Sequence, residues 1–268
     1  MKLKPLSPIR SKSAVRLSKF SPTDTGGLKS EQAAAPILVK HLAAMDQFQE
    51  VLYAGRKKAV LIVLQGMDGS GKDGTVRHIF SGINPQGCDV TSFKVPTPLE
   101  ARHDFLWRAH AAVPPLGNIG IFNRSHYEDV LSPWVHKVIS SKLARRRLED
   151  INKFEQTLTD NGVVILKFFL HISHEEQTRR LQSRLDDPDK HWKLDPADFE
   201  ERRFWPQYAA VYEEILSSSS HKHAPWFVIP SDHKWYRNLA ISTILVSALK
   251  DLKLKYPKPV LDPSKFKL

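Results

Sequence analysis

A chain of 268 residues with 41% apolar side chains is long enough for one domain with a sizeable buried core, which argues against global disorder. The single cysteine, Cys88, excludes an intramolecular disulfide and a four-cysteine metal site. No run approaches the ~20 apolar residues of a membrane helix, and the first residues lack the apolar stretch of a signal peptide. We therefore expect a cytoplasmic protein.

The net charge of +11 is concentrated at the two ends of the chain. Residues 1–30 hold seven Lys/Arg and one Asp, a net +6, and residues 250–268 hold six Lys and two Asp, a net +4. Residues 31–249 therefore carry only +1, so a polyanion site within them must be a local cluster. We expect a basic flexible arm at 1–30, and a basic C-terminal tail at 257–268.

The expected arm mixes Ser, Pro, Gly and Lys with little hydrophobic periodicity. The alternative is that it packs on the core or in a subunit interface, for which Leu17 and Phe20 are possible anchors. The domain itself is expected to occupy residues 31–256.

Hydrophobic patterns predict alternating helices and strands through this domain. Apolar residues at three- and four-residue spacing predict a helix near Ala33–Ala54. The apolar run Val60–Leu64 is typical of a buried parallel strand, and a glycine-rich turn and a helix at about Asp73–Gly82 follow it. This order predicts a three-layer α/β fold with a mostly parallel sheet. Further strands are predicted at Val90–Val95, Ile119–Phe122, Val163–Ile172 and Trp226–Ile229.

The glycine-rich turn is the strongest functional signal. Residues 66–72 fit G-x-x-x-x-G-K between a strand and a helix, where backbone N–H groups converge on phosphate and the lysine adds a charge. A glycine-rich turn that binds nothing is the alternative, but strand, glycines, lysine and helix all agree with the motif. We assign phosphate binding to Gly66, Gly69, Ser70, Gly71, Lys72, Asp73, Gly74 and Thr75.

Two carboxylates make this motif unusual. Asp73 stands where a Ser or Thr that ligates Mg²⁺ normally follows the lysine, and Asp68 lies inside the loop. Carboxylates beside phosphate repel it unless a divalent cation lies between them, so we interpret them as signs of a metal site. A structural role such as helix capping is the alternative, above all for Asp73.

A polar cluster follows the predicted strand at 119–122, at the edge where open α/β sheets bind ligands. We assign Asp129 as a magnesium ligand, Glu128 as the next candidate, and Arg124 as a phosphate contact. Acids in the first turn of a helix also stabilise its dipole, which is the alternative. The predicted catalytic residues are Asp68, Lys72, Arg124 and Asp129, and the predicted nucleotide contacts are Arg108, Asn123 and Arg124.

Basic residues surround an exposed excursion at residues 186–198 that interrupts two predicted helices. Phosphoryl transfer needs positive charge on the transition state and exclusion of water, which mobile basic lids supply. We predict a lid at about residues 180–204, whereas the alternative is a solvated helix face with salt bridges. The predicted lid and polyanion contacts are Arg180, Arg184, Lys190, Lys193, Arg202 and Arg203.

With these motifs the sequence resembles the family-2 polyphosphate kinases, in particular the single-domain members that phosphorylate AMP and ADP. The resemblance covers roughly Ala33–Tyr256. It rests on Gly66–Thr75, Asp104–Arg108, Phe122–Val130 and Leu166–His171, and Asp186–Lys193 and Trp226–Pro230 extend it.

The resemblance implies a thymidylate-kinase-like P-loop kinase fold with a helical lid, Mg²⁺ or Mn²⁺ dependence, and a homo-oligomer. It implies transfer of phosphate from polyphosphate, bound in a basic channel, to a nucleoside mono- or diphosphate. It also accounts for Asp73, which this family has after the lysine, and implies that Asp68 and Asp129 are the metal carboxylates.

Two other functions stay open from the residues alone. One is an ATP-dependent nucleoside monophosphate kinase on the same fold, and the other is a nucleic-acid-binding NTPase that uses the basic ends. The nearly neutral middle of the chain and the lack of a recognised nucleic-acid motif count against the second. The expected partners are polyphosphate, AMP, ADP and ATP, with guanine nucleotides as further candidates, and neither membrane nor nucleic acid.

Overall fold

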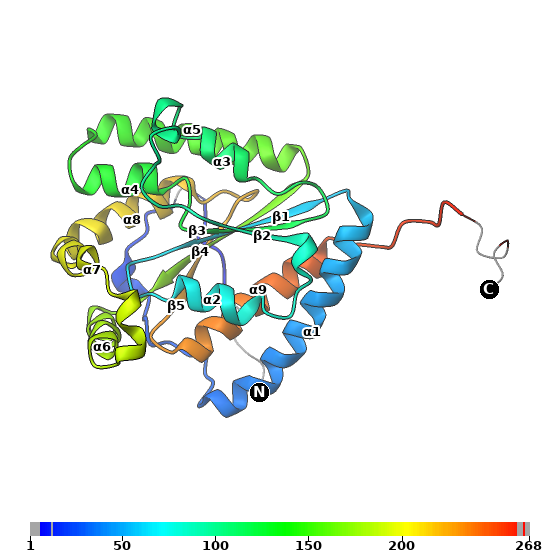
Figure 1. The fold of residues 1–268 in the computed structure, drawn as a ribbon, viewed down its shortest axis with the longest axis horizontal. Coiled ribbons are helices and arrows are strands. Elements are labelled where there is room, and N and C mark those ends of the chain that lie inside the picture. The colour runs from blue at the N-terminus through cyan, green and yellow to red at the C-terminus, as the bar shows by residue number, and fades with distance from the viewer. Residues whose placement is uncertain (1–5, 12, 262–264, 266–268) are drawn as a thin grey trace.

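The computed structural model describes residues 6–11, 13–261 and 265. In this part of the chain five strands form one parallel sheet in the order β2-β3-β1-β4-β5, with helices on both faces (Figure 1). The predicted three-layer α/β architecture is confirmed, and the sheet is parallel throughout. The strands are β1 (Ala59–Gln65), β2 (Cys88–Ser92), β3 (Ile119–Asn123), β4 (Val163–His171) and β5 (Trp226–Pro230).

Two groups of helices enclose the sheet (Figure 1). On one face lie α1 (Glu31–Gly55), α2 (Lys72–Ile79) and α9 (Lys234–Asp251), and on the other lie α3 (Trp107–Ala112), α4 (Glu128–Val135), α5 (Ser141–Asp160) and α8 (Trp205–Ser219). Short 3₁₀ turns occur at Leu17–Lys19, Pro85–Gly87 and Glu100–Arg102. Among the described residues, none of the helices combines the length and hydropathy needed to cross a bilayer.

The central strand β1 explains why the sheet has helices on both sides. All seven of its residues are buried, so the strand is apolar without interruption up to its last residue. Because side chains alternate between the faces of a strand, Leu61 and Val63 join the core beneath α5 and α8, whereas Val60, Ile62 and Leu64 join the core beneath α1 and α9. β1 therefore connects the two halves of the core.

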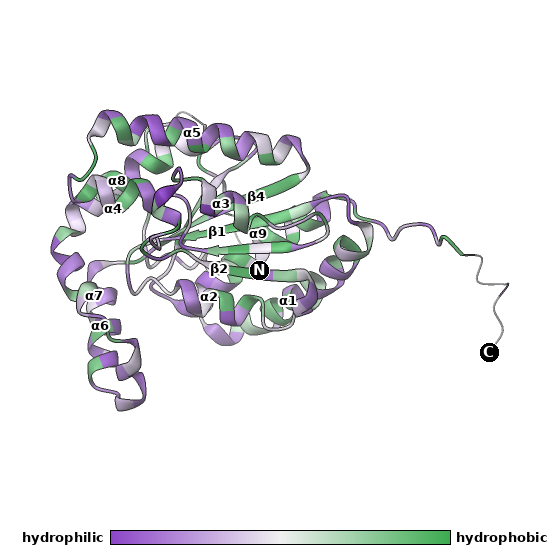
Figure 2. Cartoon of the chain, turned by 45° about the horizontal axis from the view of Figure 1, so that its top comes forward, coloured by the Kyte–Doolittle hydropathy of each residue, from purple (hydrophilic) through white to green (hydrophobic). Residues whose placement is uncertain are grey.

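The predicted lid region folds into a short helical segment that projects from the body (Figure 2). Asp187 and Asp195 cap its short helices, and a proline at the start of each fits the first helical turn. The segment consists of α6 (His174–Leu185), a 3₁₀ helix (Pro188–Lys193), α7 (Pro196–Glu201) and a second 3₁₀ turn (Arg202–Phe204), which leads into α8.

The N-terminal segment differs from the expected flexible arm. Val15 and Leu17 are buried in the core, and Phe20 packs against it. The Leu17 N–H donates to Glu213 on α8 at 2.8 Å. Val15 and Leu17 are buried while Arg16 between them is exposed. The alternative in which Leu17 and Phe20 anchor the segment on the core therefore describes the structure. Residues 1–5 and 12 lie outside the described residues.

At the other end, residues 257–261 are exposed and lead away from the body (Figure 1). The rest of the expected basic tail lies outside the described residues, apart from Lys265. The division of the chain at residues 31 and 256 stays a prediction.

We expect Leu17→Ala to lower the free energy of unfolding by about 2–4 kcal/mol, because it removes a buried side chain and leaves a cavity. Chemical denaturation with linear extrapolation measures the change. Leu261→Ala, at a side chain 65% exposed, is the matched control and should change stability by less than about 0.5 kcal/mol. Equal effects of the two substitutions would contradict the packing of the N-terminal segment.

Candidate active site

The glycine-rich loop joins β1 to α2 at the carboxyl end of the central strand. Gly66, Gly69 and Gly71 have φ angles of 151°, 76° and 99°, which lie in the region that favours glycine. A Cβ atom at Gly71 would overlap the Arg237 guanidinium, and one at Gly66 would lie 2.7 Å from the Leu170 carbonyl oxygen. The loop therefore needs glycine both for its conformation and for its close packing.

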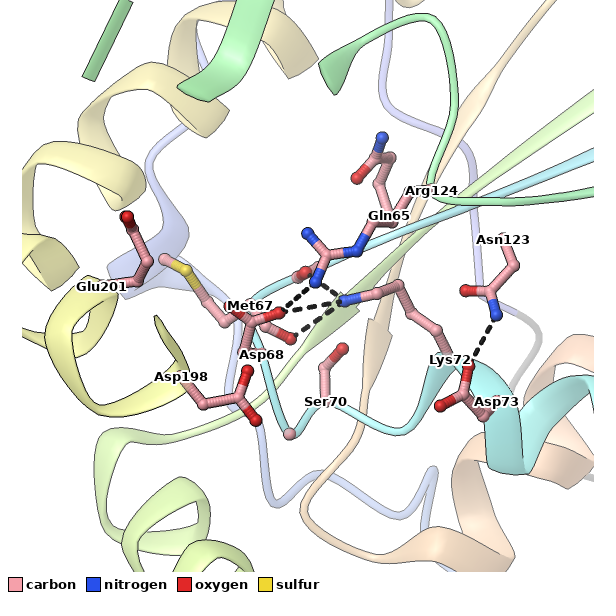
Figure 3. Close-up of polar contacts among 12 residues, drawn as sticks. Gln65, Met67, Asp68, Ser70, Lys72, Asp73, Asn123, Arg124, Asp198 and Glu201 are labelled. Atoms are coloured by element: carbon pink, nitrogen blue, oxygen red, sulfur yellow. Dashed lines mark hydrogen bonds and ion pairs between the residues drawn. The ribbon is translucent and has the colours of Figure 1, made fainter. Parts of the chain in front are cut away.

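The Lys72 side chain folds back over this loop (Figure 3). Its Nζ donates to the carbonyl oxygens of Gly66 at 2.8 Å and Met67 at 3.3 Å, and lies 4.0 Å from Asp68. Burial, with a contribution from Arg124, lowers the pKa of Lys72 although nearby carboxylates oppose the shift. An anionic ligand is a better partner for this ammonium group than two neutral carbonyl oxygens.

The Ser70 hydroxyl is buried and has no hydrogen-bond partner among the described residues. Buried polar groups are rarely left in this state. Figure 3 shows Ser70, Lys72 and Arg124 directed toward the same space. A phosphate placed there could accept from all three and from the N–H groups at the start of α2. The loop is thus suited to a phosphate.

Arg124 reaches this space from the end of β3. Because β3 pairs in parallel with β1, the Arg124 N–H donates to the Leu64 carbonyl at 3.0 Å. The residue has φ 61°, a left-handed conformation that few residues other than glycine adopt. Its guanidinium donates to Asp68 at 2.6 Å and lies 3.6 Å from Glu128. The strained backbone therefore aims the guanidinium at the P-loop.

The two acids after this turn have different partners. Glu128 faces Arg124 and Lys72, whereas Asp129 accepts from Arg108 Nη2 at 2.8 Å and Nε at 3.3 Å. Since α4 begins at Glu128 and successive helical residues are rotated by about 100°, two adjacent acids cannot face the same point. Glu128 is therefore the acid that lies beside Arg124, whereas Asp129 is paired with Arg108, and the metal role of Asp129 stays a prediction.

Three other predicted residues form local contacts. The Asn123 side chain donates to Asp73 at 2.6 Å, and this bond ties the end of β3 to the first turn of α2. Thr75 donates to the Gly71 carbonyl at 3.0 Å within that helix. Arg108, predicted as a nucleotide contact, is buried and donates to the Lys94 carbonyl at 2.7 Å as well as to Asp129. Gly74 lies in α2.

The buried Arg237 and the largely covered Arg180 support the P-loop. Arg180 donates to the carbonyls of Gly69 at 2.9 Å and Ser70 at 3.1 Å, and Arg237 donates to the Ser70 carbonyl at 3.2 Å. Burial and the neighbouring Arg180 lower the pKa of Arg237 to about 9. Arg180, predicted as a lid residue, lies on α6 of the projecting segment, and its bonds attach this helix to the P-loop. Arg237 was missed because it stands in an apolar helix without a motif.

The other predicted lid residues fall into two groups. Lys193 and Arg203 are exposed at the surface of the segment. The rest are held by neighbours, in the contacts Arg184–Asp198 at 2.8 Å, Lys190–Asp187 at 2.6 Å and Arg202–Gln177 at 3.0 Å. Some lid cations thus shape the segment, whereas others face solvent.

Asp198, on α7, is directed toward the P-loop carboxylate Asp68 (Figure 3). Burial raises the pKa of Asp198, and Asp68 adds to the shift. No motif distinguishes this residue from the other acids of the excursion. In the part of the chain that the structure describes, no three His, Cys, Asp or Glu side chains are grouped to hold a metal. Mg²⁺ commonly takes only one or two carboxylates, with phosphate oxygens and water as its other ligands, so Asp68 and Glu128 suit it.

A P-loop at the end of a central parallel strand, with an arginine, carboxylates and a helical lid around it, defines a P-loop phosphotransferase. The chain belongs to the polyphosphate kinase 2 family: the sequence profile described as "Polyphosphate kinase 2 (PPK2)" matches residues 28–257. The predicted family and its P-loop kinase fold are confirmed.

Individual relatives are similar over nearly the whole chain. An AMP/ADP-polyphosphate phosphotransferase of Meiothermus ruber is 47% identical over 91% of each chain. An ADP-polyphosphate phosphotransferase of Rhodopseudomonas palustris is 41% identical over 86% of this chain and 84% of that protein. The crystal structure of polyphosphate kinase 2 from Arthrobacter aurescens TC1 superposes with a TM-score of 0.92 at 38% identity, over 97% of this chain and 96% of the other.

Two glutamates near the site, the largely covered Glu128 and the fully buried Glu155, have opposite pKa shifts. Burial raises the pKa of Glu128 above its ordinary value of 4.5, although Arg124 and Lys72 oppose the shift. Burial alone would also raise the pKa of Glu155 on α5, but Lys167, whose ammonium lies 2.5 Å away, lowers it overall. The charged form therefore destabilises the fold at Glu128 and stabilises it at Glu155.

We expect Glu128→Gln to raise the melting temperature at pH 8, because it removes the charged carboxylate from the buried site. The folded state binds this proton more tightly than the unfolded state, so the gain should shrink as pH falls through the raised pKa toward 4.5. Glu155→Gln, the matched comparison, should instead lose about 3–5 kcal/mol because it leaves Lys167 unpaired. Thermal unfolding from pH 4 to 8 distinguishes the two variants. A lower melting temperature of Glu128→Gln than of the wild type at pH 8 would refute the conclusion that the charged Glu128 carboxylate destabilises the fold.

Proposed function

We propose that the protein transfers the terminal phosphate of inorganic polyphosphate to AMP and ADP, forming ADP and ATP, and that it catalyses the reverse reactions. The observation that carries this proposal is the convergence of Lys72, the unpartnered Ser70 hydroxyl and Arg124 on one space beside Asp68 and Glu128 among the described residues. Family membership supports the donor, and the similarity to the Meiothermus ruber protein of that name supports both acceptors.

In the forward step a phosphate oxygen of the acceptor attacks the terminal phosphorus of the polymer. The new P–O bond forms as the bond to the bridging oxygen breaks, and the shortened polyphosphate leaves with that oxygen. Lys72 and Arg124 would neutralise charge on the transferred group, while the N–H groups of the P-loop hold it in line. The projecting segment from α6 to α7 would exclude water when it closes over the loop.

The chemistry of the site suits a divalent cation, and we propose Mg²⁺ or Mn²⁺. Asp68 and Glu128 would hold it with carboxylate oxygens, the ligands that Mg²⁺ prefers. The bound cation would offset negative charge on the reacting phosphates. Arg124 lies between the two carboxylates and keeps both at the edge of the P-loop. Asp129 would act through Arg108.

For the polymer, we propose that Lys193 and Arg203, at the surface of the segment, contact polyphosphate beyond the reacting group. The other lid arginines would keep the segment in shape. The homo-oligomer and a cytoplasmic location stay predictions, as does the use of guanine nucleotides.

We expect the purified protein to form ADP and ATP from AMP, polyphosphate and Mg²⁺, measured by chromatography of the nucleotides. Lys72→Met, which removes the ammonium group from the P-loop, should abolish most of this turnover. Product from ATP and AMP without polyphosphate would favour the ATP-dependent kinase instead. Binding of a nucleic-acid duplex that persists in Lys72→Met would favour the nucleic-acid-binding NTPase. The proposal would be refuted if no purine mono- or diphosphate yields a product.

The metal assignment predicts different effects at neighbouring acids. Asp68→Asn and Glu128→Gln should each lower turnover by about a hundredfold or more and raise the Mg²⁺ concentration needed for half-maximal activity. Asp129→Asn, which frees Arg108, should lower turnover without changing the Mg²⁺ requirement. Magnesium titration of the three variants is the measurement. If Asp129→Asn were the only variant with a changed Mg²⁺ requirement, the metal ligand would be Asp129.

A further inference from the structure

A fully buried polar cluster lies behind the turn that carries Arg124. Lys167 on β4 and Glu155 on α5 are both 0% exposed and form an ion pair at 2.5 Å. The Lys167 ammonium also donates to the Tyr127 hydroxyl oxygen at 2.9 Å and the Ser219 carbonyl at 2.7 Å, and the Tyr127 hydroxyl donates to Glu155 at 2.9 Å. All three ammonium hydrogens therefore have acceptors.

This cluster is connected to the active site by a short path. Tyr127 immediately precedes Glu128, the first residue of α4, so a fixed Tyr127 ring fixes the start of that helix. The Tyr127 N–H donates to the Ser125 hydroxyl at 3.2 Å, and that hydroxyl also accepts from Gln65 at 3.1 Å. Gln65 is the last residue before Gly66. The turn is thus attached both to the P-loop strand and to the buried ion pair.

Stability alone is a poor explanation for such a cluster. Buried ion pairs seldom stabilise a fold more than apolar side chains of the same volume would, because desolvation offsets their attraction. They differ from apolar packing in being directional. The turn needs directional contacts, because the left-handed backbone of Arg124 is strained and persists only where its surroundings hold it.

We propose that Tyr127, held by the Lys167–Glu155 pair, is a positioning residue that fixes Arg124 and Glu128 against the P-loop. The inference rests on the proposed phosphate transfer, in which Arg124 contacts the transferred group. Without the Tyr127 hydroxyl, the contact of His126 Nε2 with Glu155 at 3.2 Å holds the turn to the pair less firmly. The turn then relaxes toward an ordinary backbone conformation, and the Arg124 guanidinium moves away from Asp68.

The test compares two buried tyrosines. Tyr127→Phe removes the hydroxyl that donates to Glu155 and accepts from Lys167, and it keeps both the ring and the contact of His126 with Glu155. Tyr236→Phe is the matched control: Tyr236 is 0% exposed on α9, across the sheet, and its hydroxyl has no hydrogen-bond partner among the described residues. Well below both melting temperatures, we expect kcat to fall about tenfold in Tyr127→Phe and to stay unchanged in Tyr236→Phe.

A double-mutant cycle with Arg124→Lys separates positioning from folding. If Tyr127 acts through Arg124, Tyr127→Phe should lower kcat by less than about threefold in the Arg124→Lys background, while its effect on the melting temperature is the same in both backgrounds. The same tenfold loss in both backgrounds would overturn the inference. Should Tyr127→Phe not fold, Ser125→Ala, which cuts the connection to Gln65, takes its place in the cycle.

The results also separate this inference from the proposed function. If the wild-type protein transfers no phosphate from polyphosphate, the proposed function fails before any variant is compared. If the wild type is active and Tyr127→Phe has the kcat of Tyr236→Phe, only the positioning inference fails.

Discussion

The parallel pairing of β1 with β3 and β4 is the constraint on which the site depends. In this register Leu64 lies beside both Asn123 and Phe168, so the carboxyl ends of three strands meet at one edge. The segment after each strand then supplies one part of the site: the P-loop after β1, Arg124 after β3, and the helix α6 with Arg180 after β4. Five strands enclosed by helices on both faces leave little freedom to slip, because any shift would misplace all these groups at once.

Charge balance at this edge results from the same geometry. Lys72 and Arg124 face the carboxylates of Asp68 and Glu128 from above the loop, and Arg180 and Arg237 bind its carbonyls. These carboxylates and carbonyls accept from the four cations. A phosphate would compete for the same donors, so ligand binding must rearrange contacts that the loop already makes. Burial raises the pKa of Glu128 although Arg124 and Lys72 oppose the shift, so the charged carboxylate costs stability here.

The sequence predicted the elements whose signals are local, but it did not show how individual side chains are oriented. All five strands and the P-loop could be predicted from apolar runs and glycine spacing. The sequence could not predict whether Glu128 or Asp129 faces Arg124. This depends on where α4 begins, because one residue along a helix changes the direction of a side chain by about 100°. Arg180 was predicted as a lid contact from its charge, but its hydrogen bonds to the P-loop carbonyls could not be predicted from the sequence. Arg237, Glu155 and Lys167 act through contacts between distant segments, which no spacing pattern records.

The packed N-terminal segment changes what its positive charge can do. A flexible arm would carry its cations through solution and search for a polyanion, but here Arg16 is paired with Glu213 and the neighbouring Leu17 is buried. Leu17 and Phe20 line a cavity of about 440 Å³ together with Met67 of the P-loop. The segment is therefore part of the wall beside the loop. Its exposed charges act from fixed positions, and salt limits their reach to a Debye length of ~10 Å at 0.1 M. Cations of this segment can therefore help to bind a polymer only if they lie within about one Debye length of its path.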